Sequence, residues 1–147
     1  MRDIDFSTAP FQLSDLQAWQ VMEENVDVCK ASVSCLDVAK LLINRGRGCM
    51  PIVDEEHVLI GFISEYDLLQ LVKSGAELEK ERVSDHMMTH VVSVRRESPM
   101  SEVLDILEEQ HYLRIPVTEE GKLQGLISRR DVLYATLKGK ANYYKIP

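Results

Sequence analysis

The sequence predicts a mixed α/β (α+β) fold built from two tandem copies of one βαββα unit. The first observation behind this prediction is a repeat at nearly constant offset: Pro116 follows Pro51 by 65 residues, and Gly125 follows Gly61 by 64 residues. The second is that short apolar runs of strand type alternate with segments of helical periodicity in the same order in both copies. Duplication of one supersecondary unit explains both.

Each copy centres on a proline-containing strand followed by a Gly-x-x-Ser-x-x-Asp segment. The first copy reads MPIVD at 50–54 and GFISEYD at 61–67, and the second reads IPVT at 115–118 and GLISRRD at 125–131. A serine that follows a buried strand and precedes a helix is a favourable helix cap. The pattern therefore predicts a strand-to-helix turn at Ser64 and at Ser128.

The elements of the first copy are predicted in order from these signals. A short strand lies around 26–28, and a helix follows Ser34 with apolar residues at 38, 41 and 42. Two strands at 49–53 and 58–63 meet across a polar turn, and a closing helix ends at Gly75.

The second copy follows the same order. A strand lies around 92–94, and a helix that starts near Ser98 and Pro99 carries apolar residues at 103, 106 and 107. Strands at 114–118 and 122–127 precede a closing helix that stops near Gly139. The resulting domain prediction is an N-terminal extension at 1–13, repeat one at 14–75, a charged linker at 76–82, repeat two at 83–139 and a tail at 140–147. Within repeat one, a capped helix is expected from Ser14 to Met22.

Composition restricts the class of protein. The chain has 147 residues, of which 45 % are hydrophobic and 28 % charged, as in a soluble globular protein. No apolar run approaches the ~18–20 residues of a membrane span, and the first residues have no signal-peptide core, which favours the cytoplasm. The net charge of −7 argues against DNA as a general partner. The three cysteines lack a CxxC spacing and are expected to be reduced and mostly buried.

At these residues the chain resembles a pair of cystathionine-β-synthase (CBS) domains, the tandem called a Bateman module. The resemblance covers roughly residues 16–138 and includes VSDHMMT at 83–89, which matches the start of a family repeat. It implies that the two repeats pack with pseudo-two-fold symmetry, that two chains form a homodimer, and that clefts between repeats bind adenosine-containing ligands. AMP, ADP, ATP and S-adenosylmethionine are the ligands expected.

The resemblance also implies which residues contact such a ligand. The Asp of Ser-x-x-Asp holds the ribose hydroxyls, the Ser lies near ribose or phosphate, and backbone around the strand proline flanks the base. Carried onto this chain, the predicted ligand-binding residues are Ser128, Arg129, Arg130, Asp131, Arg114, Ile115 and Pro116 in copy two, and Ser64, Tyr66, Asp67, Met50 and Pro51 in copy one.

A plain structural interpretation stands beside the functional one, because Ser-x-x-Asp also resembles a capping box. What favours ligand binding in copy two is the pair Arg129 and Arg130, since a helix N-terminus with two arginines attracts phosphate. In copy one Glu65 repels an anion, while Tyr66 stacks or packs. We therefore expect copy two to bind a phosphorylated adenosine ligand better than copy one.

Two other groups of residues allow two interpretations each. Arg45 and Arg47 either end a helix with solvated charges or reach a phosphate in the cleft. His86 and His90, four residues apart, suit a metal on one helix face, but a surface or packing role is favoured because the sequence offers no third ligand nearby. The chain has no catalytic signature of the kinds GxxxxGK[ST], GxSxG or HExxH, so no enzyme, no metal and no required cofactor are predicted.

The function that the resemblance implies is a regulatory module that senses an adenosine-type ligand and signals to an effector protein of unknown identity. The alternative is a protein–protein adaptor whose clefts are vestigial. Glu65 favours the adaptor, and Arg129 with Arg130 favours the sensor.

Overall fold

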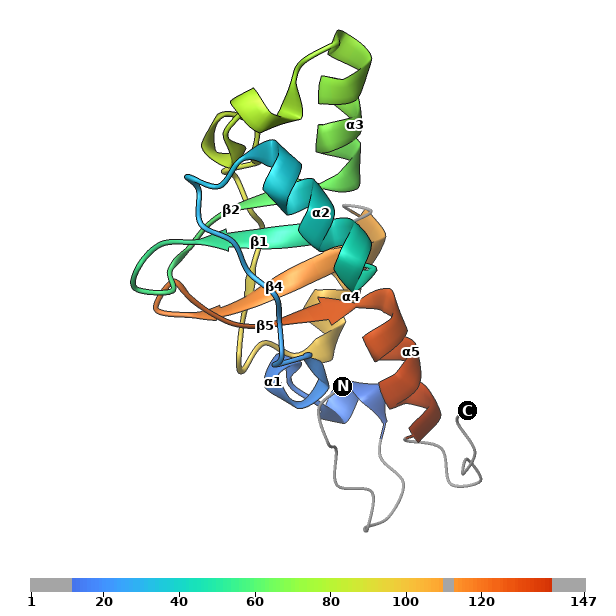
Figure 1. Ribbon diagram of the computed structural model, residues 1–147. Helices are drawn as coiled ribbons and strands as arrows, with labels where there is room; N and C mark the ends of the chain where they lie inside the picture. Colours follow the sequence, from blue (N-terminus) through green and yellow to red (C-terminus); the bar gives the residue numbers. More distant parts are fainter. Residues whose placement is uncertain (1–11, 110–112, 139–147) are drawn as a thin grey trace. The chain divides into compact units, whose positions relative to one another are not determined.

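A computed structural model describes residues 12–109 and 113–138, and it confirms the mixed α/β class. In chain order the helices and strands are α1 (Ala18–Val21), α2 (Cys35–Arg45), β1 (Cys49–Val53), β2 (Leu59–Ser64), α3 (Glu65–Ser74), β3 (Val94–Arg95), α4 (Met100–Glu109), β4 (Arg114–Glu119), β5 (Lys122–Ser128) and α5 (Arg129–Lys138) (Figure 1). Three short 3-10 helices are η1 (Leu13–Asp15), η2 (Leu78–Lys80) and η3 (Val83–Asp85).

The chain divides into two compact units. The first contains the described parts of residues 1–26, 92–120 and 124–147, and the second contains residues 27–91 and 121–123. The β2–α3 turn of copy one lies in the second unit, and the β5–α5 turn of copy two lies in the first unit.

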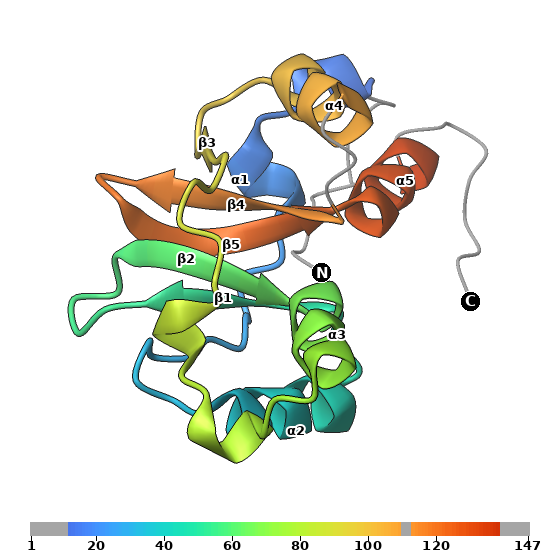
Figure 2. The ribbon, with the colours of Figure 1, turned by 90° about the horizontal axis from the view of Figure 1, so that it is seen from above.

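The second unit is a two-stranded antiparallel sheet covered by two helices. β1 and β2 pair so that Cys49 is opposite Ser64 and Pro51 is opposite Phe62. α2 packs on β1, α3 packs on β2, and the two helices contact each other (Figure 2). The core is formed by buried side chains from all four elements and from η3: Cys35, Val38, Leu42, Met50, Ile52, Ile63, Leu68, Leu71 and Val83.

The first unit is a three-stranded sheet in the order β3–β4–β5, with β3 parallel to β4. α4 packs on β4, and α1 packs on β3 and α5. Its core takes buried side chains from the first segment of repeat one as well as from copy two: Leu16, Ala18, Val21, Met22, Val94, Met100, Val103, Leu107, Ile115, Val117, Ile127, Val132 and Ala135.

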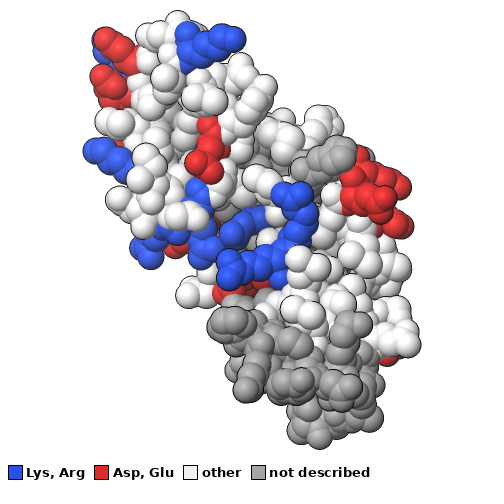
Figure 3. Space-filling view, turned by 90° about the vertical axis from the view of Figure 1, so that its right-hand side faces the viewer, with Lys and Arg blue, Asp and Glu red and all other residues white. Residues whose placement is uncertain are grey.

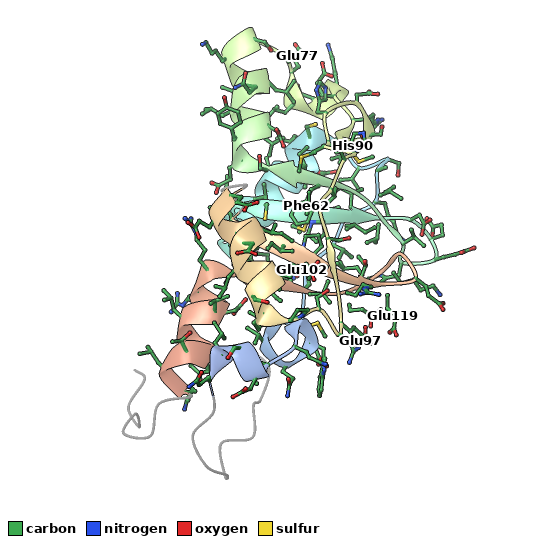
Figure 4. The ribbon with its side chains drawn as sticks, turned by 180° about the vertical axis from the view of Figure 1, so that it is seen from behind. Phe62, Glu77, His90, Glu97, Glu102 and Glu119 are labelled. Atoms are coloured by element: carbon green, nitrogen blue, oxygen red, sulfur yellow. The ribbon has the colours of Figure 1, made fainter. Side chains whose placement is uncertain are left out.

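Each unit is completed by the first segment of the other repeat. Glu23 pairs with Leu126 of β5 in the first unit, and Met88 pairs with Phe62 of β2 in the second, where Figure 4 labels Phe62. The backbone N–H of Glu23 donates to Leu126 O at 2.8 Å, and that of Met88 donates to Phe62 O at 2.8 Å. The compact units therefore cut across the predicted repeat boundaries, which stay a prediction.

The helix expected from Ser14 to Met22 is wrong as one element. η1 ends at Asp15, the backbone of Leu16 and Gln17 is extended, and α1 begins only at Ala18. The cause is tertiary, because Gln17 forms an antiparallel bridge with Pro99 and the Ala18 N–H donates to Ser98 O at 2.9 Å.

Two smaller expectations also change. No strand forms at 26–28; instead Cys29 forms a single parallel bridge with Ile52, with the Cys29 N–H donating to Pro51 O at 3.1 Å. Ser98 does not cap α4 with its side chain, because its hydroxyl accepts the Arg95 N–H at 2.9 Å. Both changes come from contacts outside the local helix or strand pattern.

The other predicted ends of the helices in copy one are confirmed. Ser34 Oγ accepts the Asp37 N–H at 3.1 Å at the start of α2. Gly75 ends α3 in the left-handed region, with φ of 81°, as a C-terminal glycine does. Gly139 lies outside the described residues.

The cysteines are in the state that the sequence predicts. Cys29, Cys35 and Cys49 are free thiols and are buried. Burial raises the pKa of the Cys29 and Cys35 thiols, with Asp27 adding to the effect at Cys29. Within the described residues, no helix is both long and apolar enough to cross a membrane.

Asp54 closes the turn between β1 and β2, and its ionisation gives a testable pH dependence. Its Oδ1 accepts the N–H groups of Val58 and Glu56, each at 2.9 Å. The bond from Val58 is the main reason that the pKa of Asp54 is lowered, and Glu56 and the positive charges of Lys30 and Lys122 add to it.

A carboxyl group whose pKa is lower in the folded state stabilises the fold above its unfolded pKa of about 3.9, and this contribution is lost as the pH falls through the folded value. Asp54→Asn is therefore expected to lower the free energy of unfolding at pH 7, and the difference from wild type should vanish in strong acid. Urea unfolding at pH 7 and at acidic pH measures this. A difference that persists undiminished in acid would contradict it.

Candidate functional site

The candidate site of copy one lies where β2 runs into α3. Ser64 is the last residue of β2 and the N-cap of α3, and its Oγ accepts the Asp67 N–H at 3.2 Å. Asp67 Oδ2 in return accepts the Ser64 N–H at 2.9 Å and the Ser64 hydroxyl at 3.0 Å. The predicted capping box is therefore formed with an aspartate at its third position.

The candidate site of copy two lies where β5 runs into α5 and has the same frame. Ser128 Oγ accepts the Asp131 N–H at 3.1 Å, and Asp131 Oδ2 accepts the Ser128 N–H at 2.8 Å. Both residues are half-buried. Three residues of separation bring each pair together, which is why the motif was visible in the sequence.

Capping and ligand binding are compatible at these aspartates. The cap uses Oδ2 of Asp67 and Oδ2 of Asp131. Among the described residues, Oδ1 of either carboxylate has no hydrogen-bond partner. A carboxylate held in place through one oxygen presents the other as an acceptor for a ligand hydroxyl pair.

The two helix starts differ in the groups that an anion would meet. The Glu65 N–H at the start of α3 donates to Gly48 O at 2.9 Å, so this amide of the first turn is already engaged. The Ser64 hydroxyl is engaged as a donor to Asp67. Because a helix N-terminus binds anions through its free N–H groups, these bonds make the start of α3 less receptive.

Charge adds to this difference. Arg129 and Arg130 are exposed in the first turn of α5, whereas the first turn of α3 exposes Glu65 and Tyr66. On the face drawn in Figure 3, many Lys and Arg side chains (blue) are gathered near the middle of the view. The expected preference of copy two for a phosphorylated ligand agrees with these groups and stays a prediction.

The strand residues of the predicted sites are buried except for the half-buried Arg114, and those of copy one lie beside the start of α3. Met50 and Ile115 have fully buried side chains, and Pro51 and Pro116 are also buried. In copy one the pairing of Cys49 with Ser64 places Met50 next to the β2–α3 turn. The backbone, rather than the side chains, of these strand residues is what a ligand could contact.

Sequence reasoning left one group of residues undecided, and the structure brings it together. Arg45 and Arg47 both lie beside Asp27 in the second unit, with Arg45 Nε 4.0 Å from Oδ1 and Arg47 Nε 3.7 Å from Oδ2. Asp27 was absent from the predicted site because 18 and 20 residues separate it from its partners, and no local pattern links them.

In the described part of the chain, His86 and His90 share no helix. His86 Nε2 lies 2.8 Å from Glu81 Oε2, and His90 lies beyond η3 in a segment without regular structure (Figure 4). The helix that would have aligned His86 with His90 is therefore not formed. Within the described residues, no group of three or more His, Cys, Asp or Glu side chains could hold a metal ion.

Two copies of a helix, two strands and a closing helix, each with a Ser-x-x-Asp helix start after a buried strand, are the arrangement of tandem CBS domain proteins. The family model of the CBS domain matches residues 17–74 and 83–138. The chain belongs to the CBS domain family, which confirms the resemblance seen in the sequence.

Curated relatives are identical to this chain at about a quarter of the aligned positions. The uncharacterized protein MJ1225 of Methanocaldococcus jannaschii is 26 % identical over 114 residues, which cover 78 % of this chain and 40 % of MJ1225. The CBS domain-containing protein CBSX2 of Arabidopsis thaliana, a chloroplastic protein, is 28 % identical over 80 % of this chain, which spans 61 % of CBSX2. The chain thus spans less than two thirds of both relatives.

Solved structures share the fold. A crystal structure of CBSX2 in complex with AMP is 29 % identical, with a TM-score of 0.73, and the match covers 87 % of this chain and 97 % of that one. The CBS domain pair of protein MJ0100, in complex with 5-methylthioadenosine and S-adenosyl-L-methionine, is 19 % identical, with a TM-score of 0.72 and coverage of 81 % and 94 %. At this identity the second likeness establishes the fold alone.

Proposed function

We propose that this protein is a regulatory module that binds an adenosine-containing nucleotide, AMP, ADP, ATP or S-adenosylmethionine, and signals its presence to a partner protein. The single observation that carries the proposal is the start of α5. There Asp131 is held through Oδ2 with Oδ1 left over, beside the exposed Arg129 and Arg130. The CBSX2 relative, solved with AMP, supports adenosine as the ligand class.

In this proposal each group at the start of α5 has one role. Asp131 Oδ1 accepts hydrogen bonds from the ribose hydroxyls, and the Ser128 hydroxyl donates to ribose or phosphate. Arg129 and Arg130 contact the phosphate, because charge-assisted bonds from guanidinium groups are stronger than neutral ones. Backbone of Arg114, Ile115 and Pro116 borders the adenine.

Isothermal titration calorimetry with AMP, ADP, ATP and S-adenosylmethionine tests the proposal. The double variant Arg130→Ala with Asp131→Ala is expected to bind AMP at least tenfold more weakly, since charged hydrogen bonds contribute about 1.5–3 kcal/mol. Asp131→Asn keeps an oxygen that accepts the Ser128 N–H, so the helix cap remains while the carboxylate charge is lost. This variant separates the effect of losing the cap from the effect of losing the contact with the ligand.

The matched control is Asp105→Ala, which removes an exposed carboxylate from α4 of the same unit. It is expected to leave AMP affinity unchanged. AMP affinity that is the same in wild type and in the double variant would contradict the assignment of the site to α5.

A protein–protein adaptor with unoccupied sites is the second candidate function, and Glu65 at the start of α3 favours it. Thermal melting separates the two, because a ligand that binds only the folded state raises the melting temperature. No shift with any of the four nucleotides at millimolar concentration would favour the adaptor.

We also propose that the protein is a cytoplasmic homodimer without catalytic activity of its own, and that it acts through an effector protein. Support for a dimer comes from apolar side chains left exposed on equivalent helices, Tyr66, Leu69 and Val72 on α3 and Leu133 and Leu137 on α5. Glu65 flanks the first set and Arg130 the second. Opposite charges therefore favour α3 of one chain packed against α5 of a second chain. Light scattering after size exclusion gives the mass that tests this.

A further inference from the structure

Residues 83–88 are held against the rest of the second unit at two places. At the upstream end, the buried Val83 donates its N–H to Val33 O at 2.9 Å. At the downstream end, Met88 and Phe62 of β2 exchange two backbone hydrogen bonds, 2.8 and 2.9 Å long. The downstream attachment can therefore open while the upstream one stays closed.

The side chain of Met87 lies directly against the backbone of β2. A Cβ atom at Gly61 would lie 2.5 Å from Met87 Sδ, 2.9 Å from Met87 Cγ and 3.1 Å from Met88 O. The missing side chain of Gly61 is thus what lets the thioether and the Met88 backbone approach the strand together. Met87 also packs on the core of the second unit, so its sulfur belongs to the contact that holds Met88 beside Phe62.

The first unit contains the same contact with a methionine that water does not reach. A Cβ atom at Gly125 would lie 2.9 Å from Met22 Sδ, yet Met22 has no exposed surface. Met50 and Met100 are equally buried, whereas Met87 is half-buried. Of the two methionines that pack on a strand glycine, only Met87 is open to a water-soluble oxidant.

We propose that Met87 is a reversible oxidation site and that its sulfoxide releases Met88 from Phe62. The oxidant is a peroxide: the sulfur donates an electron pair to one peroxide oxygen, the O–O bond breaks, and an S–O bond forms. With hydrogen peroxide, the departing hydroxide takes up a proton and leaves as water. The sulfur loses two electrons and the peroxide gains them. This modification goes beyond nucleotide binding and does not depend on it.

The physical basis is that oxidation makes an apolar contact polar. A sulfoxide is a polar, chiral group, and burying a polar group without a hydrogen bond is costly. At Met87 the sulfur faces Gly61 at a separation that leaves no space for another atom between them. The oxidised side chain therefore turns towards water, and the neighbouring Met88 backbone moves away from β2 with it.

The test treats the full chain with hydrogen peroxide and follows two quantities. Mass spectrometry of peptides measures the sulfoxide at each methionine, and NMR measures hydrogen exchange at each amide. The variant Met88→Leu is used, because Met88 is 40 % exposed and would oxidise as well, and leucine has a similar volume.

We expect the sulfoxide to form at Met87 at least tenfold faster than at Met22. We also expect the Phe62 N–H, which donates to the carbonyl oxygen of residue 88, to exchange at least tenfold faster after oxidation. Exchange at the Val83 N–H should not change, which distinguishes local release from unfolding of the unit. Equal oxidation of Met22 and Met87, or unchanged exchange at Phe62 after complete oxidation of Met87, would overturn the inference.

The matched control is the double variant Met87→Leu with Met88→Leu, in which peroxide should leave exchange at Phe62 unchanged. Reversal identifies the oxidised group. The two methionine sulfoxide reductases, one for each sulfoxide epimer, should restore slow exchange in the presence of dithiothreitol. Recovery with dithiothreitol alone would place the effect at a cysteine and would also overturn the inference.

Discussion

Replacing Gly125 by alanine is expected to destabilise the first unit by about 3 kcal/mol, which corresponds to a melting temperature lower by roughly 10–20 °C. A Cβ atom at Gly125 would lie 2.6 Å from Glu23 O, 2.9 Å from Met22 Sδ and 3.0 Å from Met22 Cγ. The backbone oxygen cannot move without breaking the pairing of Glu23 with Leu126, whose two hydrogen bonds are 2.8 and 3.0 Å long. The added methyl group therefore forces the strand and the N-terminal segment apart.

The measurement is thermal unfolding followed by far-ultraviolet circular dichroism, which reports on both units, and by tryptophan fluorescence. Trp19 is the single tryptophan of the chain and lies in α1, so it reports on the first unit. The matched control is Gly75→Ala in the second unit. A Cβ at Gly75 meets no atom within 4 Å, and only its φ of +81° opposes the change. We expect a cost of about 1 kcal/mol there. Equal effects of the two substitutions would contradict the close approach at Gly125.

Replacing Val21 by aspartate is expected to unfold the first unit. Val21 has no exposed surface and packs in the core formed mainly by copy two, although it belongs to the first segment of repeat one. A carboxylate buried there without a partner costs several kcal/mol, which is comparable to the whole stability of a small domain. Loss of amide protection from hydrogen exchange is therefore expected first in α4, β4, β5 and α5.

Ile43→Asp is the control, because it introduces an aspartate at a position that is 78 % exposed on α2. Its exchange pattern is expected to match wild type. The packing of Val21 in the core of copy two would be contradicted if Val21→Asp removed amide protection from β1, β2 and α2 while β4 and β5 kept theirs.

Predictions from the sequence succeeded where the contacts are local. Ser64 bonds with Asp67 and Ser128 with Asp131, each pair three residues apart, so a pattern of residue types was enough to place both helix starts. The strand at Cys49–Val53 was likewise predicted with its bounds, because a run of apolar residues between turn residues identifies a buried strand. These are also the elements that carry the candidate site.

Predictions failed where distant residues decide the backbone. The sequence from Ser14 to Met22 suits one helix, yet pairing with Pro99 extends Gln17 and divides it. The grouping of Asp27 with Arg45 and Arg47 is of the same kind, since it depends on how the segment before α2 runs beside β1.

By itself, the amino-acid sequence determined the repeat, the class of fold and the two Ser-x-x-Asp helix starts, because each of these is encoded by residues within one turn or one strand. Only the tertiary structure decided that the first segment of repeat one completes the sheet and core of copy two, and that residues 83–88 do the same for copy one. The physical reason is that a half-covered sheet can bury its exposed edge and apolar face with any segment of suitable pattern. Which segment does so depends on chain connectivity and close approach, such as that of Gly125 to Met22.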